Sequence, residues 1–378
     1  MTKTDASPAR PAPRPLAFAL DAGPGNWAGV RKDGAAAYQK AVDRTIELAS
    51  IADRAGIDSL WALEDPDGWD SFTVLAAMAR VTERIKLGTG VTNPYYRHPS
   101  LLAASVSTLD ALSNGRAFLG LGRGQTEWYE RSLGMHVGKP LHALNETIDL
   151  LRQWWMSPST ATSSPDATEF HINAWKRVIS PEQAKVPIYL AAAGPLAQRL
   201  AGQKADGILF NDLSSSQYMA ESVNTVRAAA SAAGRDPDNL RFCARTAVLV
   251  TDDPGTVYER RKSTVATINA LPGMERILAT PGFDIDQIIA DVRKAMRTDE
   301  ILARGGAFTD LRIGGDLAAA KRAIPFDLMH ELVIAGTARD IRERLATLQE
   351  IGITDVFLAG QGPEVTLESL SELLASLR

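Results

Sequence analysis

Short apolar runs alternate with longer amphipathic stretches along most of this chain. Short runs that are rich in β-branched and aromatic residues, and bounded by Gly, Pro, Asn or Asp, are typical of β-strands. Eight such runs predict strands at residues 16–21, 58–63, 85–91, 116–121, 186–192, 205–210, 241–250 and 354–359. Strand and helix patterns that alternate in this way indicate repeated βα units with a parallel sheet.

The stretches between these runs carry the periodicity and end signals of helices. Residues 217–233 repeat apolar side chains along one face and end at Gly234. Pro99 begins another helix, and Thr337 with Asp340 forms a capping signal before a third. Eight βα units in one chain predict an α/β fold, the (β/α)8 TIM barrel.

Two stretches interrupt the βα repeat. Residues 156–175, after the fourth strand, are polar and predict a small hairpin insertion. Residues 253–335 are far too long for one crossover helix, so we expect a helical insertion between strands seven and eight. Residues 1–15 are rich in proline and predict a disordered tail, which leaves residues 16–378 as a single barrel domain.

Composition and charge narrow the classes of partner. The chain has 378 residues, of which 45% are apolar and 23% charged, and its net charge is −4. The basic residues are scattered, so a nucleic-acid partner is not expected. Apolar windows are too short to span a bilayer, and the tail lacks the apolar region of a secretory signal. We therefore expect a cytoplasmic protein that acts on a small molecule.

The cysteine and histidine content argues against metal chemistry. Cys243 is the only cysteine, so the chain has no internal disulfide and no zinc site built on paired thiolates. It lies in the apolar run 241–250, which predicts a buried structural thiol. The five histidines show no ligand spacing, and no metal site is predicted.

The glycines of "GLGRGQ" do not form a nucleotide-binding loop. Gly120, Gly122 and Gly124 alternate, and Gln125 follows without the third glycine spacing of a dinucleotide fold. No Gly-Lys-Ser/Thr follows either, which excludes a P-loop. Two interpretations stay open: the glycines permit close packing of a strand end, or they clear space for a flat cofactor.

Polar residues recur directly after successive predicted strands. They are Asp21, Glu64, Asp65, Thr92, Asn93, Gln125 and Glu127. Barrel enzymes keep their sites at the carboxyl ends of the strands, so this recurrence indicates a site, although each residue alone could be a helix cap or a loop residue. After the fifth strand, Gly194 and Pro195 start a helix, which could receive a phosphate or could form a tight turn.

Three blocks carry a family resemblance. They are "LGTGVTNPYYRHP…ALSNGRAFLGLGRG", "VPIYLAAAGP…LAGQKADGILF" and "GTARDIRERLATLQEIGITDVFLA". Together they resemble the luciferase-like (LLM) superfamily, in the branch of coenzyme F420-dependent oxidoreductases related to methylenetetrahydromethanopterin reductase. The resemblance implies a TIM barrel and hydride transfer to or from a deazaflavin, coenzyme F420, with FMN as the alternative cofactor of the superfamily.

The resemblance also implies cofactor-binding residues. Gly194, Pro195 and Ala197 match phosphate contacts, and Glu64 matches an acid near the cofactor ring. The positions that match the surroundings of the ring are Gly90, Val91, Asn93 and Gln125. Among these, Gly90 and Val91 correspond to a strand bulge that often carries a cis peptide.

Departures from the family pattern affect the expected chemistry. Asp65 stands where sugar-oxidising members have a histidine, and Gln125, which cannot transfer a proton, stands where members often have a catalytic acid. Asp21, Asp65 and Glu127 are then the candidate catalytic acids. Without the histidine base we expect reduction of a C=C or C=N bond rather than alcohol oxidation.

Four further residues are candidates for the substrate pocket, together with the insertion 253–335: they are Trp27, His98, Trp128 and His330. His98 could instead fix the loop after the third strand, and Arg97 could pair with the cofactor tail or with a carboxylate nearby. Related enzymes suggest a homodimer. The alternatives to an F420 enzyme are an FMN-dependent luciferase-like monooxygenase and a non-catalytic barrel used for binding.

Overall fold

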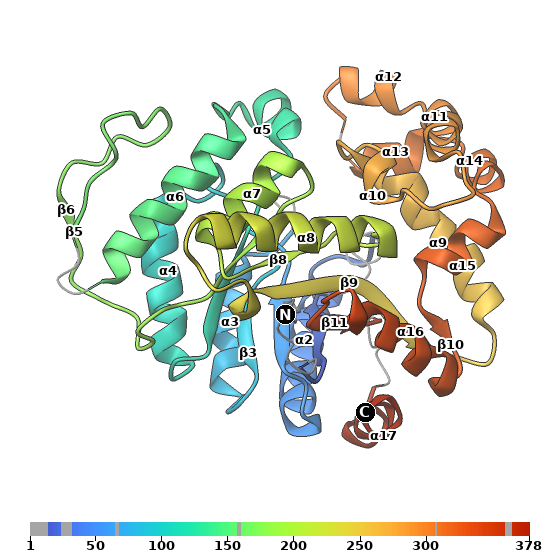
Figure 1. The fold of residues 1–378 in the computed structure, drawn as a ribbon, viewed down its shortest axis with the longest axis horizontal. Helices are drawn as coiled ribbons and strands as arrows, with labels where there is room; N and C mark the ends of the chain where they lie inside the picture. Colours follow the sequence, from blue (N-terminus) through green and yellow to red (C-terminus); the bar gives the residue numbers. More distant parts are fainter. Residues whose placement is uncertain (1–13, 24–31, 65–67, 157–159, 307, 360–364) are drawn as a thin grey trace, which may run out of the picture.

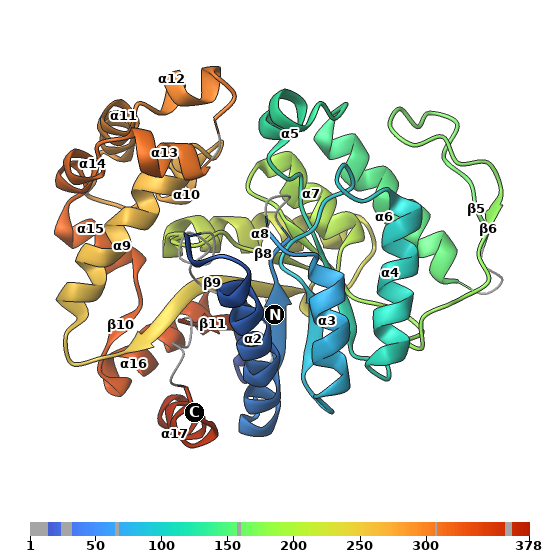
Figure 2. The ribbon, with the colours of Figure 1, turned by 180° about the vertical axis from the view of Figure 1, so that it is seen from behind.

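The computed structural model contains a closed barrel of parallel strands surrounded by helices, as Figures 1 and 2 show from opposite sides. The structure describes residues 14–23, 32–64, 68–156, 160–306, 308–359 and 365–378. Of the predicted N-terminal tail, residues 1–13 lie outside this part of the chain.

Eight strands close the barrel. They are β1 (Ala17–Ala22), β2 (Ser59–Ala62), β3 (Lys86–Thr89), β4 (Ala117–Leu121), β7 (Ile188–Ala191), β8 (Gly207–Leu209), β9 (Arg241–Val250) and β11 (Asp355–Leu358). Each pairs in parallel with the next, β8 pairs with β9, and β11 returns to β1 through Ala17 opposite Asp355. Each of the eight predicted strands is therefore confirmed, together with the TIM-barrel fold.

Helices cover the outside of this barrel. They are α2 (Ala35–Ala55), α3 (Ser71–Arg80), α4 (Pro99–Leu112), α5 (Thr126–Leu133), α6 (Pro140–Trp155), α7 (Pro195–Lys204), α8 (Ser216–Ala232), the short 3-10 helix η1 (Pro237–Asn239), α16 (Ala338–Glu350) and α17 (Leu367–Leu377). The predicted signals act as expected: Pro99 is the first residue of α4, and Thr337 and Asp340 form a capping box at α16. The C-terminal helix α17 packs against α2.

Both predicted insertions are present. The first contains a small antiparallel pair, β5 (Thr160–Ala161) and β6 (Trp175–Lys176). The second lies beside the barrel (Figure 1) and consists of α9 (Pro254–Ile268), α10 (Met274–Ile277), α11 (Ile285–Met296), α12 (Thr298–Ala303), α13 (Phe308–Gly314), α14 (Leu317–Ala323) and α15 (Phe326–Leu332). It returns through β10 (Ala335–Gly336), which pairs with the end of β9.

Aromatic side chains fill the inside of the barrel. Trp61 is central, because its ring centroid lies 4.4 Å from Phe118, 5.2 Å from Tyr189 and 5.6 Å from Phe357. Cys243 lies in the same buried cluster, and burial raises the pKa of its thiol well above the ordinary value. The expectation of a buried structural thiol is confirmed, since a buried protonated thiol is unreactive.

Gly120 of β4, and Gly122 directly after that strand, lie against β3 and the residues that follow it. A Cβ on Gly120 would lie 2.0 Å from the Thr89 carbonyl oxygen, and one on Gly122 would lie 2.7 Å from Val91 Cγ2. Thr89 Oγ1 also donates to the Gly120 carbonyl at 2.7 Å. Of the two interpretations of this cluster, close packing between strands is the one that the contacts of Gly120 support.

Candidate functional site

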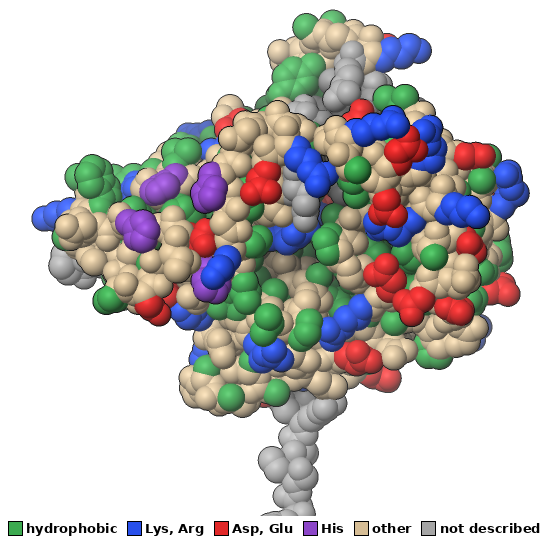
Figure 3. All heavy atoms as spheres, turned by 90° about the horizontal axis from the view of Figure 1, so that it is seen from above, with side chains coloured by type: hydrophobic (Ala, Val, Ile, Leu, Met, Phe, Trp, Pro, Cys, Tyr) green, Lys and Arg blue, Asp and Glu red, His purple; other side chains and the backbone are tan. Residues whose placement is uncertain are grey.

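A cavity of about 530 Å³ opens at the carboxyl ends of the barrel strands. Figure 3 looks onto this face of the molecule, which is hollowed near its centre. Seven of the predicted cofactor-binding residues line the cavity: Glu64, Gly90, Val91, Asn93, Gln125, Gly194 and Ala197. The eighth, Pro195, is the first residue of α7 and lies between two lining residues in sequence.

Glu64 is a buried carboxylate whose oxygens are both occupied. Ser71 Oγ donates to Oε1 at 3.0 Å, Arg97 Nε donates to Oε1 at 2.7 Å, and Thr92 Oγ1 donates to Oε2. Arg97 also pairs with Asp70; burial alone would lower its pKa, but the bonds to Glu64 and Asp70 raise it. The sequence left two partners open for Arg97, the cofactor tail and a nearby carboxylate, and the structure shows the nearby carboxylates.

The amide of Asn93 is fixed on both sides. Its Oδ1 accepts from the backbone N–H groups of Tyr95 and Tyr96, and its Nδ2 donates to the hydroxyl of Tyr129 at 3.0 Å. Tyr129 comes from α5 and lines the cavity, although the sequence reasoning did not single it out. The available signal was its place one turn into the helix after the fourth strand.

The Gly90–Val91 peptide bond is cis, and a guanidinium lies beside it. Arg245 Nη2 donates to the Gly90 carbonyl at 2.8 Å and to Asp21 Oδ1 at 2.5 Å. Burial raises the pKa of Asp21, and the charge of Arg245 opposes that rise. Sequence reasoning missed Arg245, whose signal was a charged residue inside the apolar run of β9.

The N-terminus of α7 is open toward the cavity. Gly194 precedes this ten-residue helix and provides no side-chain cap. A Cβ at Gly194 would meet no atom within 4 Å, and Gly194, Leu196 and Ala197 all line the cavity. Backbone N–H groups that lack partners at such a helix start can bind an anion.

The three candidate substrate residues that the structure describes do not line this cavity. His98 caps α4 by accepting from Ser100 N–H, its ring meets Phe170 edge-on, and burial lowers its pKa. Trp128 lines an adjoining cavity of about 220 Å³ that reaches the second insertion. His330 lies on α15, 3.5 Å from the Glu331 carboxylate, and is not among the lining residues.

Three of the predicted residues cannot be placed as side chains. Trp27 and Asp65 lie outside the described residues, and only the backbone of Glu127, within α5, is described. Asp21 is therefore the one candidate acid whose side chain the structure describes. Within the described ranges, no three His, Cys, Asp or Glu side chains converge to hold a metal ion, and no helix is long and apolar enough to cross a membrane.

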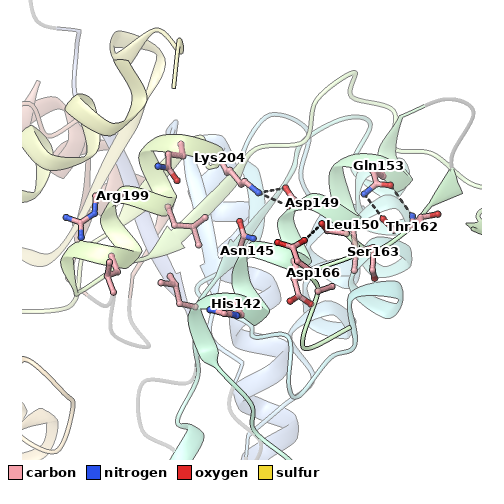
Figure 4. A pocket seen from close by; sticks show the side chains of 17 residues that line it. His142, Asn145, Asp149, Leu150, Gln153, Thr162, Ser163, Asp166, Arg199 and Lys204 are labelled. Carbon is pink, nitrogen blue, oxygen red and sulfur yellow. Dashed lines mark hydrogen bonds and ion pairs between the residues drawn. The ribbon is translucent and has the colours of Figure 1, made fainter. Parts of the chain in front are cut away.

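A second, more polar cavity of about 590 Å³ lies outside the barrel (Figure 4). It is bounded by α6, α7 and residues 162–167. Several of its charged groups are engaged: Lys204 binds Asp149 at 2.6 Å, Asp166 accepts from Ser164 Oγ, and Glu146 accepts from the backbone N–H groups of residues 168–170. Leu141 and Leu196 line both cavities, so the two spaces adjoin.

Comparison with known proteins assigns this chain to one family. The model of the family described as luciferase-like monooxygenase matches residues 25–355. A 5,10-methylenetetrahydromethanopterin reductase of Methanolobus tindarius is 30% identical over 309 residues, covering 82% of this chain and 87% of the relative. An F420-dependent hydroxymycolic acid dehydrogenase of Mycobacterium tuberculosis is 33% identical over 224 residues, covering 56% of this chain and 60% of the relative.

A solved structure has the same fold over nearly the whole chain. The coenzyme F420-dependent tetrahydromethanopterin reductase from Methanopyrus kandleri superposes with a TM-score of 0.71 at 23% identity. The match covers 95% of this chain and 97% of that chain. It supports the barrel architecture, because both chains are covered almost completely.

Proposed function

This chain belongs to the luciferase-like family, and on that premise we propose that it is a coenzyme F420-dependent oxidoreductase. One observation carries the proposal: seven of the eight residues that match cofactor-binding positions line one cavity. These residues follow β2, β3, β4 and β7, which are widely separated along the sequence. The names of the two sequence relatives, a reductase and a dehydrogenase, support hydride-transfer chemistry without choosing its direction.

The residues present fit a flat deazaflavin with a phosphate tail. Gly90, Gly122 and the run Ala191–Ala193 give part of the wall small side chains, which leaves room for a ring system. The open start of α7 at Gly194 suits a phosphate, since its early N–H groups carry partial positive charge. The mainly apolar remainder of the lining would exclude water from the ring.

Each proposed role follows from these contacts. Gly194, Pro195 and Ala197 would hold the phosphate, while Gly90 and Val91 would support the ring. Glu64 would keep this wall rigid rather than exchange a proton, because both of its oxygens are engaged. Asn93, locked by Tyr129, and Gln125 would provide polar contacts at the ring edge.

We propose Asp21 as the proton donor. Bound F420 would supply hydride, and reduction of a C=C or C=N bond also needs a proton at the second atom. Desolvation raises the pKa of Asp21, and Arg245 stabilises the carboxylate that remains after the proton leaves. Asp21 is not itself among the lining residues, and its pairing with Arg245, which is, connects it to the cavity. Asp65 and Glu127 are the other acids proposed from the sequence.

A hydride-transfer assay tests this function. Purified protein is mixed without oxygen with reduced F420 and compounds that carry activated C=C or C=N bonds, and the return of oxidised deazaflavin absorbance is followed. We expect protein-dependent re-oxidation with at least one compound. Oxygen-dependent turnover with reduced FMN alone would favour the luciferase-like monooxygenase, and absence of both reactions would favour a non-catalytic barrel.

We further propose that the protein is a cytoplasmic homodimer. The resemblance to the F420-dependent branch of the family supports this proposal. Exposed apolar side chains on α4 and near β6 provide a surface for pairing: Leu101, Trp175, Val178 and Ile179. Light scattering coupled to gel filtration tests this directly. A mass of one chain at micromolar concentration would contradict the dimer.

A further inference from the structure

Arg245 presents hydrogen-bond donors that no described protein group uses. Its Nη2 is engaged by Asp21 and by the Gly90 carbonyl, but its buried Nε has no partner, and no bond to Nη1 is found in the described part of the chain. The side chain is 17% exposed and lines the cavity. Nε is enclosed by protein, so Nη1 is the donor that a ligand in the cavity would meet. A charged donor that finds an acceptor there no longer bears the cost of an unmade hydrogen bond.

The orientation of this guanidinium is fixed before any ligand binds. Asp21 and Gly90 hold one edge, and Arg245 Cζ lies 5.3 Å from the centroid of the Phe357 ring. An arginine side chain that is already stacked and hydrogen-bonded loses little further conformational freedom when a ligand binds to it. The geometry is therefore that of a preorganised oxygen-binding group.

The rest of the cavity shows why this group would select a ligand. Its lining is mainly apolar, with Leu63, Leu144, Leu271, Pro272 and Ile277 among the larger side chains. The other described charged residues of the lining are engaged, Glu64 by Arg97 and Arg123 by Thr126. An apolar pocket with a preoriented cationic edge favours an apolar molecule that carries an anionic oxygen group.

We propose that Arg245 is a specificity-determining residue that binds the carboxylate of a mainly apolar substrate. The proposal rests on the proposed function, because it assigns the substrate class of the same cavity. The same anionic chemistry could come from the acidic groups of the cofactor, and the two sources are separated by measuring both affinities. The Asp21 carboxylate would compete with the substrate carboxylate for the Arg245 guanidinium, so the charge state of Asp21 would set how strongly Arg245 attracts the substrate.

Calorimetric titration tests the site with trans-cinnamate, an unsaturated apolar carboxylate, and with cinnamamide, its uncharged analogue. F420 affinity is measured first, so that failure of the proposed function is recognised separately. With F420-loaded protein we expect cinnamate to bind more tightly than cinnamamide. Arg245→Met should weaken cinnamate at least about tenfold, with cinnamamide nearly unchanged, and Arg245→Lys should retain part of the affinity.

Arg261→Met provides the matched control. Arg261 is 19% exposed and paired with Asp212, and it is not among the lining residues of the cavity. Arg261 affects Asp21 only by longer-range charge interaction, so its loss should weaken cinnamate binding clearly less than the loss of Arg245 does. Equal cinnamate affinity in wild type and in both Arg245 variants would overturn the proposal, as would a loss confined to F420 affinity. If Arg245→Met does not fold, Arg245→Lys decides between these outcomes.

Discussion

Arg97 and Glu64 form a buried ion pair in the wall of the cavity. Arg97 Nη2 lies 2.6 Å from Glu64 Oε1, and solvent reaches almost none of either side chain. Without the Glu64 charge, the buried Arg97 guanidinium keeps only the half-exposed Asp70 carboxylate as an ionic partner. Glu64→Gln keeps the shape but loses the charge, and we expect a loss of about 3 kcal/mol in the free energy of unfolding. Denaturant titration measures this.

Asp70→Asn is the control for that change. Asp70 also pairs with Arg97, but its side chain is 48% exposed, and Asn caps the start of α3 as well as Asp does. We expect a loss below about 1 kcal/mol, as for other exposed pairs. Equal losses of unfolding free energy in Glu64→Gln and Asp70→Asn would show that the buried pair stabilises the fold no more than the exposed pair does.

Gly194 tests the phosphate role of α7. An alanine there meets no neighbouring atom, so Gly194→Ala should leave the melting temperature unchanged. The added methyl would stand in front of the open N–H groups, and we expect F420 affinity to fall about tenfold. Gly255→Ala, at the start of α9, is the matched variant and should change neither property. Unaltered F420 binding by Gly194→Ala would rule out this phosphate site.

The raised pKa of Asp21 predicts a pH dependence of anion binding. As pH rises through this pKa, the carboxylate forms and competes for Arg245, so cinnamate affinity should fall. The other charged groups coupled to Asp21 are Asp212 and Arg261, which pair with each other. Asp21→Asn should remove the fall with pH. An identical pH profile in the variant would exclude Asp21 as its source.

The buried thiol of Cys243 predicts resistance to labelling. Its pKa is raised by burial, and the thiolate is the reactive form. We expect a disulfide-exchange reagent to leave the native protein unlabelled for hours and to label one thiol in guanidinium chloride. Complete labelling of the native protein within minutes would contradict the buried position.

The fold was predictable from sequence to a large extent, because buried parallel strands leave continuous apolar runs and their helices leave a clear period. The polar lining residues Glu64, Asn93 and Gln125 were predictable for a related reason, since barrel topology brings strand ends to one face. Gly90, Val91 and Ala197 followed only from the family resemblance. What could not be predicted was pairing across the chain. Nothing local indicates that Arg245 meets Asp21, or that Tyr129 meets Asn93.

The predicted substrate residues illustrate the same limit. His98 follows a strand and looked available, but its position directly before Pro99 makes it the cap of α4. His330 lies in the second insertion, whose packing against the barrel leaves no periodic signal in the sequence. Such positions depend on how separate helices pack, which residue patterns within one segment do not determine.

Equilibrium binding of the two candidate cofactors tests the central claim most directly. The purified protein is titrated in parallel with oxidised F420 and with FMN, and binding is followed by cofactor fluorescence. We predict saturable one-to-one binding of F420, with FMN at least about tenfold weaker. Tight binding of FMN together with no binding of F420 would contradict the assignment as an F420-dependent oxidoreductase.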